Sequence, residues 1–141
     1  MGDPPRRRSV RPHARALRRA CDSYHRWPDD FDLLAERGFN AYRFGVEWAR
    51  IEPEEGRIDA DAVAHYRAMV EGAVARGLAP VVTLHHFTHP AWFTAGGGWR
   101  RPDAVAHFTA YVRRVLPVLG DEVRTVVTIN EPNMLAVLVR A

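Results

Sequence analysis

The sequence predicts an α/β fold in which parallel strands alternate with covering helices. Helical and strand-like segments alternate along most of the 141 residues, and each strand-like run is short and apolar. These runs begin near residues 39, 80 and 123, a spacing of about forty residues that suits successive βα units. A doubly wound sheet and a (β/α)8 barrel both satisfy the pattern, and both bind ligands at the carboxyl ends of their strands.

Three segments are predicted to be helical. Residues 29–38 follow Pro28, carry acids in the first turn and end in glycine. Residues 59–76 place apolar side chains on one stripe, and residues 102–119 run from a proline to a glycine stop. Pro117 should end or kink the last turn of the third helix because proline has no N–H and its ring crowds the preceding turn.

Three runs are predicted to be strands. Residues 39–46 are rich in aromatics, residues 78–85 form an apolar run bounded by Gly and Pro, and residues 123–130 end before a proline. Residues 86–101, after the second strand, are the longest predicted loop. They are rich in Gly and aromatics, and loops of that length are often functional.

Composition and charge bound the class of protein. A single cysteine, Cys21, excludes an internal disulfide framework and fits a reducing compartment, so we expect a cytoplasmic location. No apolar run approaches the length of a membrane span. Residues 1–19 contain seven Arg and one acid, and we expect them to be a disordered, solvated tail, with a nucleic-acid-binding arm as the alternative. Residues 20–141 then form the folded domain.

The pentapeptide Thr128–Pro132 is the most informative motif. It follows the apolar pair Val126–Val127 and ends in an amide, a carboxylate and a proline. Because proline cannot extend a central strand, the strand must stop at about Asn130. Glu131 is therefore expected at the carboxyl end of a strand, where a rigidly held carboxylate suits general acid/base chemistry on a sugar. A strand followed by an ordinary polar loop is the alternative.

Polar side chains capable of chemistry follow all three predicted strands, and parallel strands should bring them to one edge of the sheet. They are Arg43 and Glu47 after the first strand, His85 and His86 after the second, and Asn130 and Glu131 after the third. Strand alternation sends adjacent side chains to opposite faces, so at most one of the two histidines belongs to a site. Histidines without a neighbouring acid match no zinc pattern, so no metal or cofactor is expected.

Aromatic side chains near the same edge favour a carbohydrate ligand, because sugars present C–H faces to aromatic rings. Phe87 and Trp48 are the candidate aromatic sugar contacts, although Trp48 also fits a position in the core. No Gly-rich phosphate loop follows any strand. The acidic stretch Glu52, Glu54 and Glu55 is expected to be a solvated turn.

Four ordered motifs at plausible spacing cover roughly residues 20–139. They are Tyr24–Trp27 with Asp30, Asn40–Phe44 with Trp48–Ile51, Pro80–Phe87 with Gly97–Trp99, and Thr128–Pro132. Together they resemble family 1 glycoside hydrolases, the β-glucosidase family. The resemblance implies a (β/α)8 barrel, a β-linked glucoside or related glycoside as substrate, and a retaining mechanism with two glutamates.

The resemblance also implies roles for single residues. Glu131 matches the general acid/base, and Asn130 matches the residue that hydrogen-bonds the sugar 2-hydroxyl. His86 matches a histidine that binds the glycone, and Arg43 matches the arginine that supports the nucleophile. Phe87 stands where many members have Trp.

Two parts of the family pattern are not found. The family's first strand, with its glycone-binding Gln, should lie before residue 20, and no Gln occurs in the chain. The nucleophile motif of the Thr-Glu-Asn-Gly type is absent as well. We therefore expect a partial barrel of about three βα units, an inactive fragment that carries the acid/base Glu131 and self-associates through uncovered barrel edges. A non-catalytic sugar-binding or structural module, an Arg-tailed nucleic-acid binder and a different barrel glycosidase are the alternatives.

Overall fold

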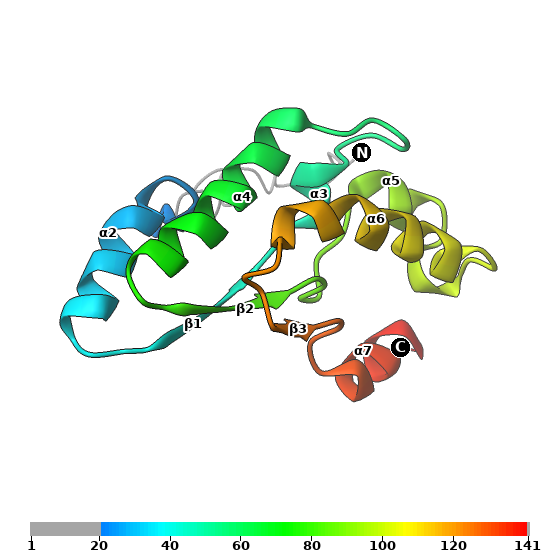
Figure 1. Ribbon diagram of the computed structural model, residues 1–141. Helices are drawn as coiled ribbons and strands as arrows, with labels where there is room; N and C mark the ends of the chain where they lie inside the picture. The colour runs from blue at the N-terminus through cyan, green and yellow to red at the C-terminus, as the bar shows by residue number, and fades with distance from the viewer. Residues whose placement is uncertain (1–20, 141) are drawn as a thin grey trace, which may run out of the picture.

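The computed structural model describes residues 21–140, so the predicted Arg-rich tail, residues 1–19, lies outside the described residues. Helices and strands alternate along the chain (Figure 1). The elements are α2 (Ser23–Glu36), β1 (Ala41–Gly45), α3 (Trp48–Ile51), α4 (Ala60–Ala75), β2 (Ala79–Thr83), α5 (Ala91–Ala95), the 3-10 helix η1 (Gly98–Arg100), α6 (Ala104–Leu119), β3 (Thr125–Val127) and α7 (Pro132–Arg140).

The three strands form one parallel sheet in the order β1-β2-β3. The register places Arg43 beside Val81, and Val81 beside Thr125. Each strand is joined to the next by a segment that contains helices, as parallel connections require. This confirms the predicted parallel α/β architecture.

The main helices α2, α4 and α6 lie along one side of the sheet (Figure 1). Burial in β1 alternates accordingly, because Phe44 faces these helices and is buried whereas Arg43 and Gly45 are exposed on the other face. Helices on one face and small or polar side chains on the other are the arrangement of one wall of a barrel.

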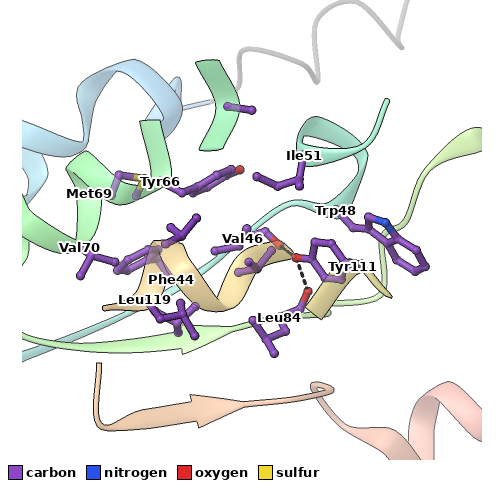
Figure 2. Close-up of a cluster of buried hydrophobic side chains, with 14 of the residues drawn as sticks. Phe44, Val46, Trp48, Ile51, Tyr66, Met69, Val70, Leu84, Tyr111 and Leu119 are labelled. Carbon is purple, nitrogen blue, oxygen red and sulfur yellow. Dashed lines mark hydrogen bonds between the residues drawn. The ribbon is translucent and has the colours of Figure 1, made fainter. Parts of the chain in front are cut away.

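The core lies between the sheet and these helices. Phe31, Trp48, Tyr111 and Phe93 are among its largest side chains, and none is more than 1% exposed. Tyr111 of α6 lies on the helix side of the sheet, next to Val46, which follows β1, and Leu84, which follows β2 (Figure 2). Its hydroxyl lies 3.0 Å from the carbonyl oxygens of both Val46 and Leu84, so α6 is fixed to the two strands where the functional residues begin.

Helix α2 starts at Ser23, six residues before the predicted start, and it passes through Pro28. Proline at this position gives up one backbone hydrogen bond. Aromatic packing explains why the helix forms all the same: Tyr24 stacks on His65 with ring centroids 3.7 Å apart, and Trp27 packs against Phe31. Burial of two large aromatic side chains outweighs the single lost hydrogen bond.

The other elements match the predicted ones with shorter strands. The predicted strand over residues 123–130 is a regular strand only over Thr125–Val127, and beyond it the N–H of Asn130 still donates to the carbonyl oxygen of His85. Helix α6 continues past Pro117 to Leu119 and stops at Gly120, as the glycine predicts. The predicted loop over residues 86–101 contains α5 and η1.

Candidate active site

Arg43 joins the carboxyl ends of the three strands. Its Nε donates to Oγ1 of Thr83 over 2.8 Å, and its Nη2 donates to Oδ1 of Asn130 over 2.5 Å. The backbone N–H of Asn130 donates to the carbonyl oxygen of His85 over 2.8 Å. The sequence placed Arg43 and Asn130 at the ends of different strands, and the fold brings their side chains into contact.

Asn130 is held at a defined position and in a defined orientation. Its side chain is buried, with 7% exposure, and Arg43 uses its amide oxygen. The Nδ2 group therefore keeps its two N–H donors for another partner. A fixed amide donor at the carboxyl end of a parallel strand suits recognition of a ligand hydroxyl.

Glu131 follows at the start of α7 and is exposed. Its φ of 44° lies in the left-handed region that non-glycine residues rarely adopt. The carbonyl oxygen of Glu131 accepts the N–H of Leu135 over 3.1 Å, so the first turn of α7 holds this backbone conformation. Within residues 21–140 the carboxylate makes no side-chain hydrogen bond, and it is free to meet a ligand.

The two adjacent histidines follow the end of β2 and differ in exposure, because His85 is buried and His86 is exposed. His86 is exposed and its ring meets Phe87 edge-on, with centroids 5.4 Å apart. Phe87 is half-buried and has a φ of 66°. His86 and Phe87 therefore lie beside the end of β2, as the sequence predicts.

His85 is a core residue. It is 1% exposed, its ring stacks on His89 and meets Trp99 edge-on, and its Nε2 lies 3.4 Å from Nδ1 of His89. Burial, together with the nearby His89 and His86 rings, lowers the pKa of His85 to about 4. His85 is therefore neutral at physiological pH and serves packing.

Trp48 and Glu52 require corrections. Trp48 is 1% exposed and packs against Trp92, Phe93 and Tyr111, so the expected sugar contact by its side chain is wrong (Figure 2). Its indole N–H donates to Oε2 of Glu52 over 3.0 Å.

Glu52 does not belong to a solvated turn, because it is 5% exposed. Its Oε1 accepts the N–H of Gly56 over 2.8 Å and Nη1 of Arg114 over 3.1 Å. Arg114 lies 62 residues away along the chain, so no local pattern signals this burial.

Glu47 is a residue near the site whose contacts sequence reasoning missed. Its Oε2 accepts the hydroxyl of Thr88 over 2.7 Å, and its Oε1 accepts the N–H of Ala49 at the start of α3. Glutamate is not among the residues preferred at the start of a helix, so the sequence carries no signal for this cap. The bond to Thr88 crosses between two strand ends and has no sequence signal.

Neither a metal-binding cluster nor a membrane-spanning helix occurs in the described part of the chain. Among residues 21–140 no three His, Cys, Asp or Glu side chains gather in a way that would hold a metal ion. Nor does this part contain a helix that is long and apolar enough to cross a membrane.

The family follows from comparison with known proteins. The family model described as Glycosyl hydrolase family 1 matches residues 6–139, nearly the whole chain. The chain belongs to glycosyl hydrolase family 1. The Arg43–Asn130 contact and Glu131 thus lie at the strand ends of a family 1 barrel segment.

Curated relatives of this family 1 chain include β-glucosidases. It is 40% identical over 114 residues to a β-glucosidase of Agrobacterium sp., a match that covers 80% of this chain and 25% of the relative. It is 38% identical over 117 residues to coniferin β-glucosidase of Pinus contorta, with 82% of this chain and 23% of the relative covered. The chain therefore spans about a quarter of the length of these relatives.

Solved structures agree. The apo structure of β-glucosidase 1317 superposes with a TM-score of 0.78 at 50% identity, covering 80% of this chain and 28% of that chain. A β-glycosidase from Pyrococcus horikoshii gives a TM-score of 0.78 at 40% identity, covering 81% of this chain and 27% of that chain. The three βα units of this family 1 chain are thus part of a (β/α)8 barrel, as the resemblance implied.

Proposed function

We propose that this chain supplies the acid/base half of a β-glucosidase active site, with Glu131 as the acid/base catalyst. One observation carries the proposal: Glu131 is an exposed carboxylate directly after Asn130, whose side chain Arg43 binds at the carboxyl ends of parallel strands. In a retaining glycosidase such a carboxylic acid protonates the leaving oxygen and later takes a proton from the attacking water.

The neighbouring residues suit complementary roles. Asn130 would donate an Nδ2 hydrogen to the oxygen of the sugar 2-hydroxyl, because its Oδ1 already accepts from Arg43. His86, exposed after β2, would bind another hydroxyl of the glycone, with Phe87 as an aromatic contact beside it. Arg43 uses two N–H groups within the sheet and has others left for a second carboxylate.

That second carboxylate would come from outside residues 21–140. Retention requires two carboxyl groups about 5–5.5 Å apart. In the described part of the chain, Glu47 is the other carboxylate at a strand end, and it is already bonded to Thr88 and Ala49. The 141-residue chain alone should therefore not hydrolyse a glycoside.

The proposed substrate is a β-linked glucoside. Several curated relatives are β-glucosidases, and the SghA structure, to which this chain is 39% identical, is described as a complex with the substrate analog salicin. Salicin and 4-nitrophenyl β-glucoside are suitable probes, since both join a glucosyl group to an aryl leaving group.

The test has two arms. The purified chain, incubated with 4-nitrophenyl β-glucoside, should release no nitrophenol above the buffer rate. Full-length protein that contains this chain should turn over both probes. Glu131→Gln should lower kcat on salicin, whose phenol is a poorer leaving group than nitrophenol, by about 10²–10⁴-fold because the proton donor is lost. Glu36→Gln, in the last turn of α2, is the matched control and should leave kcat unchanged.

Robust hydrolysis by the 141-residue chain, abolished by Glu131→Gln, would overturn the half-site proposal. An unchanged kcat in the full-length Glu131→Gln variant would overturn the acid/base role.

A sugar-binding function without turnover is the second candidate, favoured by the lone carboxylate at Asn130. Saturable binding of salicin to the purified chain without hydrolysis, lost in Asn130→Ala, would support it.

Self-association is a separate expectation: within the described sheet β1 and β3 each pair with one neighbour only, so both edges expose backbone groups. Sedimentation should then show mass that rises with concentration.

A further inference from the structure

The turn after β2 holds a strained backbone. Between the buried His85 and the start of α5, the chain passes through exposed His86, half-buried Phe87 and exposed Thr88. Phe87 has a φ of 66°, a conformation that a bulky residue rarely adopts and that needs support from its surroundings. What holds this turn determines where the His86 side chain lies.

The inner side of the turn is held by packing. His85 and His89 stack with ring centroids 5.7 Å apart and an interplanar angle of 16°, and the nitrogens of the two rings approach to 3.4 Å. The ring of His89 also meets Phe93 edge-on. These contacts fix both ends of the turn and leave the residues between them to be held from outside.

The outer side is held by one hydrogen bond to another strand end. The hydroxyl of Thr88 donates to Oε2 of Glu47 over 2.7 Å, although 41 residues separate the two. A hydroxyl that donates to a carboxylate forms a charge-assisted bond, stronger than a bond between neutral groups. This bond connects the turn after β2 with the segment after β1.

Glu47 is a fixed acceptor. Its Oε1 accepts the N–H of Ala49, its own N–H donates to the hydroxyl of Tyr66 over 3.2 Å, and its side chain is half-buried. Tyr66 belongs to the core and is 4% exposed. Because α3 and the core hold Glu47 in place, its free oxygen is preorganised for Thr88.

We infer that Glu47 and Thr88 are positioning residues, a latch that fixes the turn carrying His86. The latch deepens the proposed function, since it would set where a glycone-binding His86 meets the sugar. The structural part stands by itself: without the Thr88 hydroxyl, the strained turn loses its link to β1 and opens locally. Thr88 is the donor in this bond, because the ionised carboxylate of Glu47 can only accept. A carboxylate in place of Thr88 would face the carboxylate of Glu47 and repel it.

Backbone ¹⁵N relaxation on the purified 141-residue chain tests the latch without any need for activity, because it measures how rigidly residues 86–89 are held. Thr88→Val removes the hydroxyl but keeps the shape, and the order parameters of residues 86–89 should fall from about 0.85, the value of rigid backbone, to below about 0.6. Thr88→Ser keeps the donor and should return the wild-type order parameters. The control, Thr109→Val, removes an exposed hydroxyl of α6 and should change nothing in the turn.

A charge test completes the design. Thr88→Asp should open the turn more than Thr88→Val, because two carboxylates then face each other. Adding Glu47→Gln should bring the order parameters of the Thr88→Asp variant back toward the wild-type values, since the new amide can donate to Asp. Wild-type order parameters at residues 86–89 in Thr88→Val would overturn the latch. So would lower order parameters spread equally over the core strands, because that result means a general loosening and no positioning role.

Discussion

Arg43 and Asn130 are 87 residues apart in the chain, and their side chains form a hydrogen bond of 2.5 Å across the carboxyl ends of the sheet. The bond fixes the amide of Asn130, and Asn130 in turn directly precedes Glu131. The geometry of the candidate site therefore depends on an arginine whose planar fork reaches Thr83 and Asn130 at once.

Replacing Arg43 by Lys should weaken this connection. A lysine ammonium cannot span both acceptors, so we expect the free energy of unfolding to fall by about 1 kcal/mol. A double-mutant cycle of Arg43→Lys and Asn130→Ala, with the free energies of unfolding measured by urea denaturation, should give a coupling energy of about 1 kcal/mol. Arg113→Lys, on the exposed side of α6, is the control and should change stability by less than half as much. Additive effects of the two site substitutions would show that the bond contributes nothing to stability.

Glu52 offers a second test, because it combines burial with three donors. The indole of Trp48, the N–H of Gly56 and the guanidinium of Arg114 all donate to its carboxylate. Glu52→Gln puts an N–H₂ group opposite at least one of these donors and removes the charge, which should cost about 2 kcal/mol. Urea denaturation followed by tryptophan fluorescence measures the change.

The matched control is Glu54→Gln, two residues away. Its carboxylate pairs with Arg57 at the surface, and the side chain of Glu54 is 71% exposed. Exposed ion pairs contribute little, so this change should stay within about 0.5 kcal/mol. Equal effects of the two substitutions would contradict the buried role of Glu52.

The sequence carried enough information for the order of elements and for the strand ends. Periodicity predicted α4 and α6 closely, and Pro132 after the amide and the carboxylate marked the end of the third strand-like run. Both signals are local, because they depend on the spacing of apolar side chains and on the missing N–H of proline.

What the sequence did not reveal depends on distant partners. Helix α2 passes through Pro28 because the ring of Tyr24 stacks on His65. Glu52 is buried because Arg114 and Trp48 both donate hydrogen bonds to its carboxylate. Trp48 is the kind of aromatic residue that contacts sugars, yet it is the first residue of α3 and is buried in the core. Tertiary contacts of this kind override local preference, and single-sequence patterns do not contain them.

The buried imidazole of His85 should make the chain less stable in mild acid. Burial, with His89 and His86 nearby, lowers its pKa from the usual 6.5 to about 4. Burial also lowers the pKa of His89. Between pH 6.5 and 4 the imidazole of His85 therefore binds a proton in the unfolded chain but not in the folded chain. The free energy of unfolding falls as the pH falls through this window. Integrated over the window, His85 accounts for a loss of about 3 kcal/mol.

His85→Phe isolates this effect, because it keeps an aromatic ring among His89, Trp99 and Phe108 while removing the titrating group. Urea denaturation of both proteins at intervals from pH 7.5 to 4 should show a flatter decline for the variant, with the difference confined to values below about 6.5. Thr109→Val, at an exposed position of α6, is the control, and its decline should parallel that of the wild type. Parallel declines for wild type and His85→Phe would mean that His85 takes up its proton equally in the folded and unfolded chains. The acid sensitivity would then have to arise from other groups, such as the half-buried His65, whose pKa burial also lowers.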